Sequence, residues 1–123
     1  MLLNIKVEDW NEVSREWLEP AMKDDPAYSI DDLKHDVIEG DLALCNVYNE
    51  KQEHIASFVL RLDQISNDYS ELVVVAAGGY LKGASLYTCI TPYVIQTAKK
   101  TGVQAIRGRS EEHTSELQSP LDI

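Results

Sequence analysis

The chain has 123 residues and a formal net charge of −10, with Asp and Glu outnumbering Lys and Arg by 21 to 11. This length is typical of one domain with a small core. Its acidic balance argues against a nucleic-acid partner, because phosphate binding calls for clustered Lys and Arg. It lacks an apolar run of membrane-spanning length and the pattern of a signal peptide, so we expect a cytoplasmic protein without a membrane partner.

The N-terminal part predicts one short strand, at 2–7, followed by two helices. The first helix is expected to begin at Asp9 as the N-cap, with Glu12 at its third position. Its apolar stripe at helical spacing consists of Trp10, Val13, Trp17, Leu18 and Ala21, which we interpret as core. Pro20 predicts a kink or a restart, because proline removes a helical hydrogen bond.

The second helix is expected to run from a Ser29 cap, with Asp32 at the third position, to Gly40. Two strands should follow at 41–48 and 54–63, separated by a polar loop of hairpin length. His35 and His54 are expected to be solvated. Cys45 and Cys89 lack metal-ligand spacing, so we interpret them as buried reduced thiols and expect no metal site.

The stretch from 72 to 102 organises the rest of the chain. Leu72–Ala77 is a continuous apolar run, which predicts a central strand covered on both faces. Gly78 and Gly79 should end it, and a helix should follow from about Lys82 to Gly102. Thr91-Pro92 leaves two alternatives open, namely two helices or one helix that bends. A last strand at 103–107 should lie parallel to the central strand by the usual crossover rule.

The sequence therefore predicts a single α+β unit with a mixed sheet. A buried strand that leads through glycines into a helix is also a place where a phosphate-bearing ligand can bind, because the first helical N–H groups are unpaired.

The last segment, at 109–123, resembles the translation of a short-read sequencing adapter. The resemblance is carried by the run RSEEHTSELQS at 109–119. We accordingly place the native domain at 1–108, truncated near Gly108, and expect a non-native, disordered tail whose His113, Glu111 and Glu116 have no functional role. The alternative is a polar native tail, which the composition also allows.

The order of elements over 1–108 resembles the N-terminal two-thirds of the GNAT acetyltransferase superfamily, and more narrowly the small GNAT-like proteins of tailed phages and prophages. The residues that carry this resemblance are Trp10 with Val13, Tyr28-Ser29 with Asp32-Leu33 and Gly40, Val73-Val74-Val75 before Gly78-Gly79, and Ala98 before Gly102. The resemblance implies a mixed sheet flanked by helices and C-terminally truncated. It also implies acetyl-CoA as the coenzyme and an amine as the acceptor.

The resemblance further implies where the coenzyme would bind. The backbone of Val75, Ala76 and Ala77 would pair with the pantetheine arm, and the turn and helix start would take the phosphates. The residues implied there are Gly78, Gly79, Lys82, Gly83, Ala84 and Ser85. The superfamily signature is Gln or Arg, two residues, Gly, one residue, then Gly or Ala. Tyr80 and Ser85 depart from it, whereas Gly83 fits and Lys82 offers a point charge to phosphate.

Acetyl transfer needs a base for the amine and an acid for the leaving thiolate. By analogy Glu71, opening the fourth strand, is the candidate base. The alternative is that Glu71 is only a solvated charge, as an exposed carboxylate at a strand end usually is. The superfamily's acid is commonly a Tyr in the helix after the fifth strand, which would lie beyond Gly108. Two alternatives stay open: a catalytically inactive phage GNAT-like interaction module, or an unrelated small α+β binding domain if 72–77 and 103–107 are not neighbours.

Overall fold

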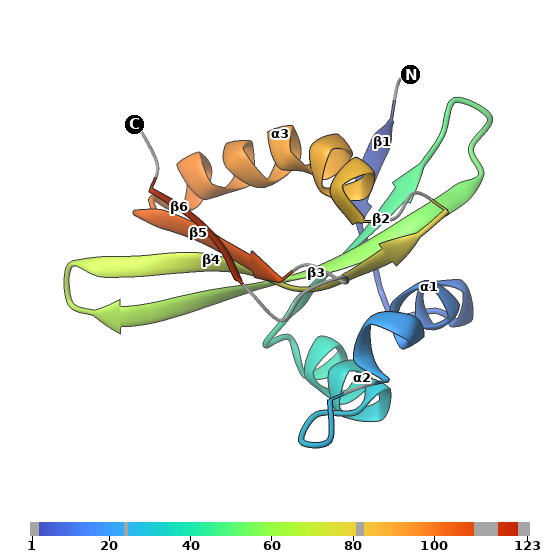
Figure 1. Ribbon diagram of the computed structural model, residues 1–123, viewed down its shortest axis with the longest axis horizontal. Helices are drawn as coiled ribbons and strands as arrows, with labels where there is room; N and C mark the ends of the chain where they lie inside the picture. The colour runs from blue at the N-terminus through green and yellow to red at the C-terminus, as the bar shows by residue number, and fades with distance from the viewer. Residues whose placement is uncertain (1–2, 24, 81–82, 110–115, 121–123) are drawn as a thin grey trace.

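One mixed β-sheet runs through the molecule, with helices on both faces (Figure 1). The computed structural model describes residues 3–23, 25–80, 83–109 and 116–120. The sheet follows chain order: β1 (Asn4–Val7), β2 (Ala43–Tyr48), β3 (His54–Ser66), β4 (Tyr69–Gly79), β5 (Ala105–Arg109) and β6 (Glu116–Pro120). Neighbouring strands are antiparallel except β4 and β5, which are parallel. The predicted parallel pairing is therefore confirmed, so the condition that would favour an unrelated domain is not met.

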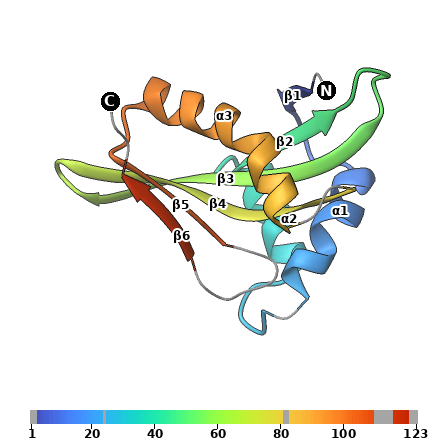
Figure 2. The ribbon, with the colours of Figure 1, turned by 45° about the horizontal axis from the view of Figure 1, so that its top comes forward.

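Helix α3 (Gly83–Thr101) covers one face of the sheet, and α1 (Glu12–Met22) and α2 (Ile30–Glu39) cover the other (Figure 2). Because side chains alternate along a strand, each face has its own apolar core. Leu86, Ile90 and Val94 of α3 pack on the face that carries Phe58 and Val74. On the other face, the core is formed by Leu18, Met22, Leu33, Leu44, Val59 and Ala76. The predicted α+β class is confirmed, and none of the described helices is long and apolar enough to cross a membrane.

Helix α1 begins later than predicted. Asn11, rather than Asp9, is the N-cap, and its side chain accepts a hydrogen bond of 2.9 Å from the Ser14 N–H. The predicted stripe is also rotated, since Ser14, Leu18 and Met22 are buried while Val13 is exposed. The sequence pattern failed because it assigned the inward face to the largest apolar residues, whereas a small serine lies in that face. Pro20 is inside α1, which continues to Met22.

Helix α2 agrees with the prediction at both ends. Ser29 and Asp32 form a reciprocal capping box, and Gly40 ends the helix with a left-handed φ of 89°. Leu33 is its buried residue, and His35 is exposed as expected.

Strand β4 is longer than the predicted 72–77 and does not stop at Ala77. Gly78 and Gly79 belong to the strand, paired with Ser57 and Ala56 of β3. The backbone N–H of Tyr80 then donates to the Ile55 carbonyl at 2.8 Å, which extends the contact beyond the strand. The expected glycine turn is therefore wrong at this position, because glycines can pair in a ladder as other residues do.

Between the two alternatives for the following segment, the structure has one helix, α3, with Pro92 inside it. The Thr91 hydroxyl donates to the carbonyl of Tyr87, one turn earlier, so Thr91 is a helical residue and not an N-cap.

The last two described strands lie on either side of Gly108, near which the native domain is expected to end. Strand β5 includes Arg109, and β6 pairs antiparallel with it, with Gly108 opposite Leu117. An open strand edge can pair with almost any extended segment, because backbone groups make the bonds. The tail expected at 109–123 thus includes β6, and the domain boundary and the adapter origin of the segment stay predictions.

Candidate functional site

The edge of β4 that faces β5 is paired over only part of its length. β4 pairs with β5 from Glu71, opposite Ala105, to Val74, opposite Gly108. On its other edge β4 stays paired with β3 as far as Gly79. No described strand therefore pairs with the β5-facing edge of 75–79, and its N–H and C=O groups are available for an extended ligand.

A β-bulge marks the point where the two strands part. Leu60 lies opposite Val74 and Val59 opposite Ala76, so Val75 is an extra residue in β4. A bulge bends its strand and increases the local twist, which directs the end of β4 away from its parallel neighbour. Val75 and Ala76 accordingly both contact the core beneath α1 and α2.

Gly79 has a packing reason to be glycine. A Cβ atom at this position would lie 2.4 Å from the Ala56 Cβ and 2.6 Å from the Ala56 Cα and the Ile55 carbonyl oxygen. Only a residue without a side chain lets β3 and β4 approach this closely, so Gly79 secures the far end of the splayed strand.

The start of α3 follows directly after β4. Gly83 is its first residue, and Ser85, in the first turn, is exposed. Its opening N–H groups have no partner within the helix, which favours an anion. The predicted residue Lys82 lies outside the described residues, and Tyr80 is 78% exposed.

Glu71 is not the exposed strand-end carboxylate that the sequence predicted. It is the third residue of β4, and its side chain is only 5% exposed. The Arg107 Nη1 atom lies 3.9 Å from its Oε1 atom, while Oε2 has no hydrogen-bond partner among the described residues. The prediction failed because β4 begins at Tyr69, before the expected start, which places Glu71 between β3 and β5 rather than at an end.

A polar cluster beneath α1 was missed by sequence reasoning. The hydroxyls of Ser14 and Ser57 both donate to the Asn46 Oδ1 atom at 2.8 Å, and Asn46 Nδ2 donates to Glu8 Oε1 at 3.0 Å. Hydrogen bonds from Tyr48 and Asn46 hold the pKa of Glu8 below its ordinary value. The sequence separations between these residues leave no local pattern that would reveal the cluster.

His54 belongs to the same cluster, so its predicted solvated position is wrong. Its Nε2 atom lies 2.8 Å from the Ser57 hydroxyl, and burial lowers its pKa. Its backbone carbonyl accepts a hydrogen bond of 3.2 Å from the Trp17 indole N–H. Ser57 is fully buried and His54 is half-buried, so only the Ser57 end of this pair lies in the core.

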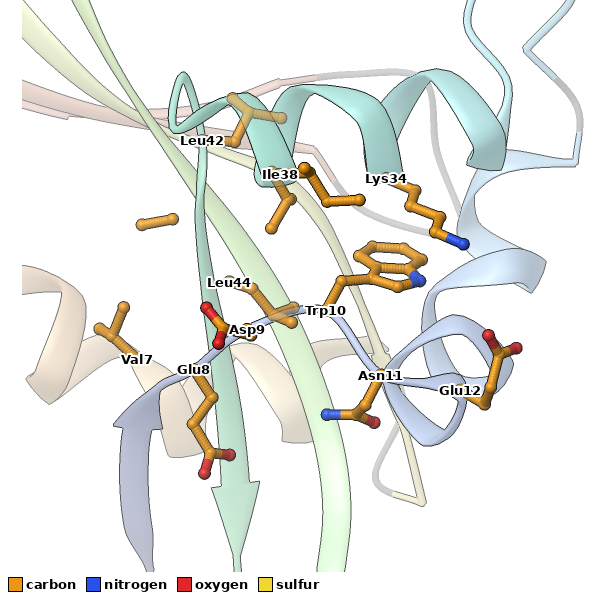
Figure 3. A pocket seen from close by; sticks show the side chains of 12 residues that line it. Val7, Glu8, Asp9, Trp10, Asn11, Glu12, Lys34, Ile38, Leu42 and Leu44 are labelled. Carbon is orange, nitrogen blue, oxygen red and sulfur yellow. The ribbon is translucent and has the colours of Figure 1, made fainter.

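A separate hollow of about 670 Å³ lies on the α2 side of the sheet (Figure 3). Its lining comes from the segment after β1, from α2 and from β2, with Trp10 beside Lys34 and Ile38. The candidate residues on β4 and α3 lie elsewhere, so this hollow is not part of the predicted site.

The two cysteines are free, and burial raises the pKa of the Cys45 thiol to about 12. Cys45 is buried as predicted, whereas Cys89 is half-buried. Within the described part of the chain, no three His, Cys, Asp or Glu residues are grouped as metal ligands.

No protein-family model and no curated protein sequence matches the chain. Solved structures do match. An acetyltransferase from Bacillus subtilis, solved with CoA, has a TM-score of 0.61 at 18% identity, over 87% of this chain and 64% of that one. An acetyltransferase from Trypanosoma brucei has a TM-score of 0.58 at 12% identity, over 98% of this chain and 99% of that one. The PaiA N-acetyltransferase from Thermoplasma acidophilum, solved with coenzyme A, has a TM-score of 0.55 at 12% identity, over 94% of this chain and 83% of that one.

These likenesses confirm the predicted GNAT-like fold. At such identities they show the fold alone. The chain spans 64% of the length of the Bacillus subtilis protein.

Proposed function

We propose that this protein is an acetyl-CoA-dependent N-acetyltransferase that acts on an amine acceptor. The observation that carries the proposal is the parting of β4 from β5 after Val74, while β4 stays paired with β3 to Gly79. Two of the proteins that share the fold were solved with CoA, which supports a coenzyme of this class.

The chain offers two kinds of group to such a coenzyme. The unpaired backbone edge at Val75, Ala76 and Ala77 suits the amide groups of a pantetheine arm, which would extend the sheet as an added strand does. Beyond it, Gly78 and Gly79 lead toward the opening N–H groups of α3 at Gly83, Ala84 and Ser85, which suit the phosphates. We assign Lys82 to the same phosphates as a point charge.

Glu71 is the proposed base. When bound, acetyl-CoA supplies a thioester carbonyl carbon, to which the amine nitrogen bonds as the carbon–sulfur bond breaks and the thiolate leaves. The Oε2 atom of Glu71, which lacks a described partner, receives the proton that the amine loses. Because the carboxylate is buried, we propose that one water carries the proton to it.

Coenzyme binding is tested with Ser85→Asp, using Ser85→Asn as the matched neutral control. A carboxylate in the first turn stabilises a helix by about 0.3–1 kcal/mol but repels a phosphate bound there. We expect the Asp variant to melt at the same or a higher temperature than wild type, yet to lose most of the melting-temperature increase caused by acetyl-CoA. If acetyl-CoA raises the melting temperature of that variant as much as that of wild type, the phosphates do not bind at the start of this helix.

Catalysis is tested by release of free CoA thiol with a panel of primary amines and polyamines. Glu71→Gln should lower kcat by about 10²–10⁴-fold, the usual contribution of a general base, while acetyl-CoA binding is retained. A wild-type protein that binds acetyl-CoA but releases no thiol with any amine would contradict the enzyme proposal and favour the inactive interaction module.

A further inference from the structure

Charged side chains from three neighbouring strands meet on the sheet face opposite α3. Asp63 of β3 lies directly across from Glu71 of β4, and Arg107 of β5 lies across from Val73 of the same strand. Residues that are paired across strands, or two apart along one strand, share a face. Arg61, Asp63, Glu71 and Arg107 therefore project on one side, while Leu72 packs on the α3 side.

Arg107 is shared between the two carboxylates. Its Nη1 atom lies 3.9 Å from Glu71 Oε1, and its Nη2 atom lies 3.7 Å from Asp63 Oδ2. Asp63 is also held by Arg61, whose Nε and Nη2 atoms donate to its two oxygens at 2.6 and 2.9 Å. These bonds keep the pKa of Asp63 below its ordinary value, so Asp63 is a fixed negative charge beside Glu71.

Burial makes the arginine necessary to Glu71. The Glu71 side chain is 5% exposed, and an ionised carboxylate removed from water needs a compensating charge. Among the described residues, Arg107 is the cation that forms an ion pair with Glu71, through its Oε1 atom. The second oxygen, Oε2, has no described partner.

We propose that Arg107 is a positioning residue for Glu71, and that Asp63 limits its effect by competing for the same guanidinium. Arg107 holds Oε1 in place, which leaves Oε2 for the proton of the acceptor amine. Asp63 opposes this, because its carboxylate also contacts the guanidinium and draws Arg107 away from Glu71. This inference rests on the proposed function, since it assigns how the proposed base is held.

The inference predicts opposite effects for two substitutions. Arg107→Gln removes the compensating charge, so the acidic limb of the kcat/KM profile should move to higher pH by about one unit or more. Asp63→Asn removes the competing charge, so the same limb should move to lower pH. A role in packing alone would lower activity at every pH without moving the limb in opposite directions.

The experiment records kcat/KM against pH for wild type, Arg107→Gln, Arg107→Lys and Asp63→Asn. Arg107→Lys keeps a positive charge and should restore most of the wild-type profile. Arg15→Gln is the matched control, because Arg15 pairs at 2.9 Å with Asp31, between α1 and α2, and its loss should leave the acidic limb in place. Acetyl-CoA binding should be unchanged in all four variants.

The outcomes separate this inference from the function on which it rests. A wild-type protein without transferase activity at any pH overturns the proposed function. An active wild type whose limb moves the same way in Arg107→Gln and Asp63→Asn, or in neither, overturns the positioning role alone. If Arg107→Gln does not fold, Asp63→Asn still decides, because a limb that stays in place or moves to higher pH contradicts the competition.

Discussion

At the scale of single residues, Gly79 shows how packing, rather than a turn, can demand glycine. Gly79→Ala would place a Cβ 2.4 Å from Ala56 and within 2.6 Å of backbone atoms of β3. We expect a loss of about 1–3 kcal/mol in the free energy of unfolding, because the strands must separate to admit the methyl group. Urea denaturation measures it.

Gly108→Ala is the control for that experiment. A Cβ at Gly108 would meet nothing closer than 3.5 Å, so its free energy of unfolding should stay within about 0.5 kcal/mol of wild type. Equal losses for the two substitutions would argue against the close approach of β3 and β4 at Gly79.

Glu8 provides a pH-dependent test of the buried polar cluster. Its pKa in the folded protein is held below the ordinary 4.5, first by Tyr48 and then by Asn46. A carboxyl with a depressed folded pKa stabilises the fold above its unfolded pKa, and this stabilisation is lost as pH falls through the folded pKa. The urea midpoint of wild type should therefore decline below about pH 4.5 more steeply than that of Glu8→Gln, which titrates no carboxyl at this position.

The residues of this cluster also show the limit of sequence reasoning. Ser14, Asn46 and Ser57 are all fully buried, yet they are residues that usually face solvent. Their partners are distant in sequence, so local periodicity has no access to them. Glu71 was identified by resemblance, but its burial and its partner Arg107 depend on three strands meeting, which only the fold supplies.

At the scale of elements, sequence signals predicted the helix ends and strands that depend on interactions between residues close in sequence. The capping box at Ser29 and Asp32 and the left-handed Gly40 fixed both ends of α2, because each is a short-range backbone interaction. The apolar run at 72–77 located the central strand for the same reason. At the start of α1 the capping pattern at Asp9 and Glu12 misplaced the N-cap, which is Asn11.

The proline inside α3 gives a prediction at this scale. Pro92 is exposed and lacks the N–H that an interior helical residue donates one turn back. Pro92→Ala should raise the free energy of unfolding by about 1–3 kcal/mol, since alanine restores the donor and proline is the poorest helix former. Thermal denaturation checks this, and a lower melting temperature would show that Pro92 instead stabilises the required shape of α3.

At the scale of the whole molecule, the order of elements was enough to predict the sheet, the parallel β4–β5 pair and the GNAT-like fold. The resemblance implied that Val75, Ala76 and Ala77 would pair with a pantetheine arm, but the parting of β4 from β5 after Val74 was not predictable. It depends on the bulge at Val75, which arises from pairing with β3 and has no sequence signature of its own. The pairing of β6 with β5 was likewise not expected from its polar sequence.

The central claim is that the free edge of β4 at 75–79 receives the coenzyme, and amide hydrogen exchange followed by NMR tests it most directly. With saturating acetyl-CoA, amide protons of 75–79 that face β5 should exchange more slowly, because they gain hydrogen-bond partners. Those of β1 (Asn4–Val7), an outer strand of the sheet, should be unchanged. Protection absent from 75–79, or equal in β1, would contradict the claim and remove the main support for the proposed function.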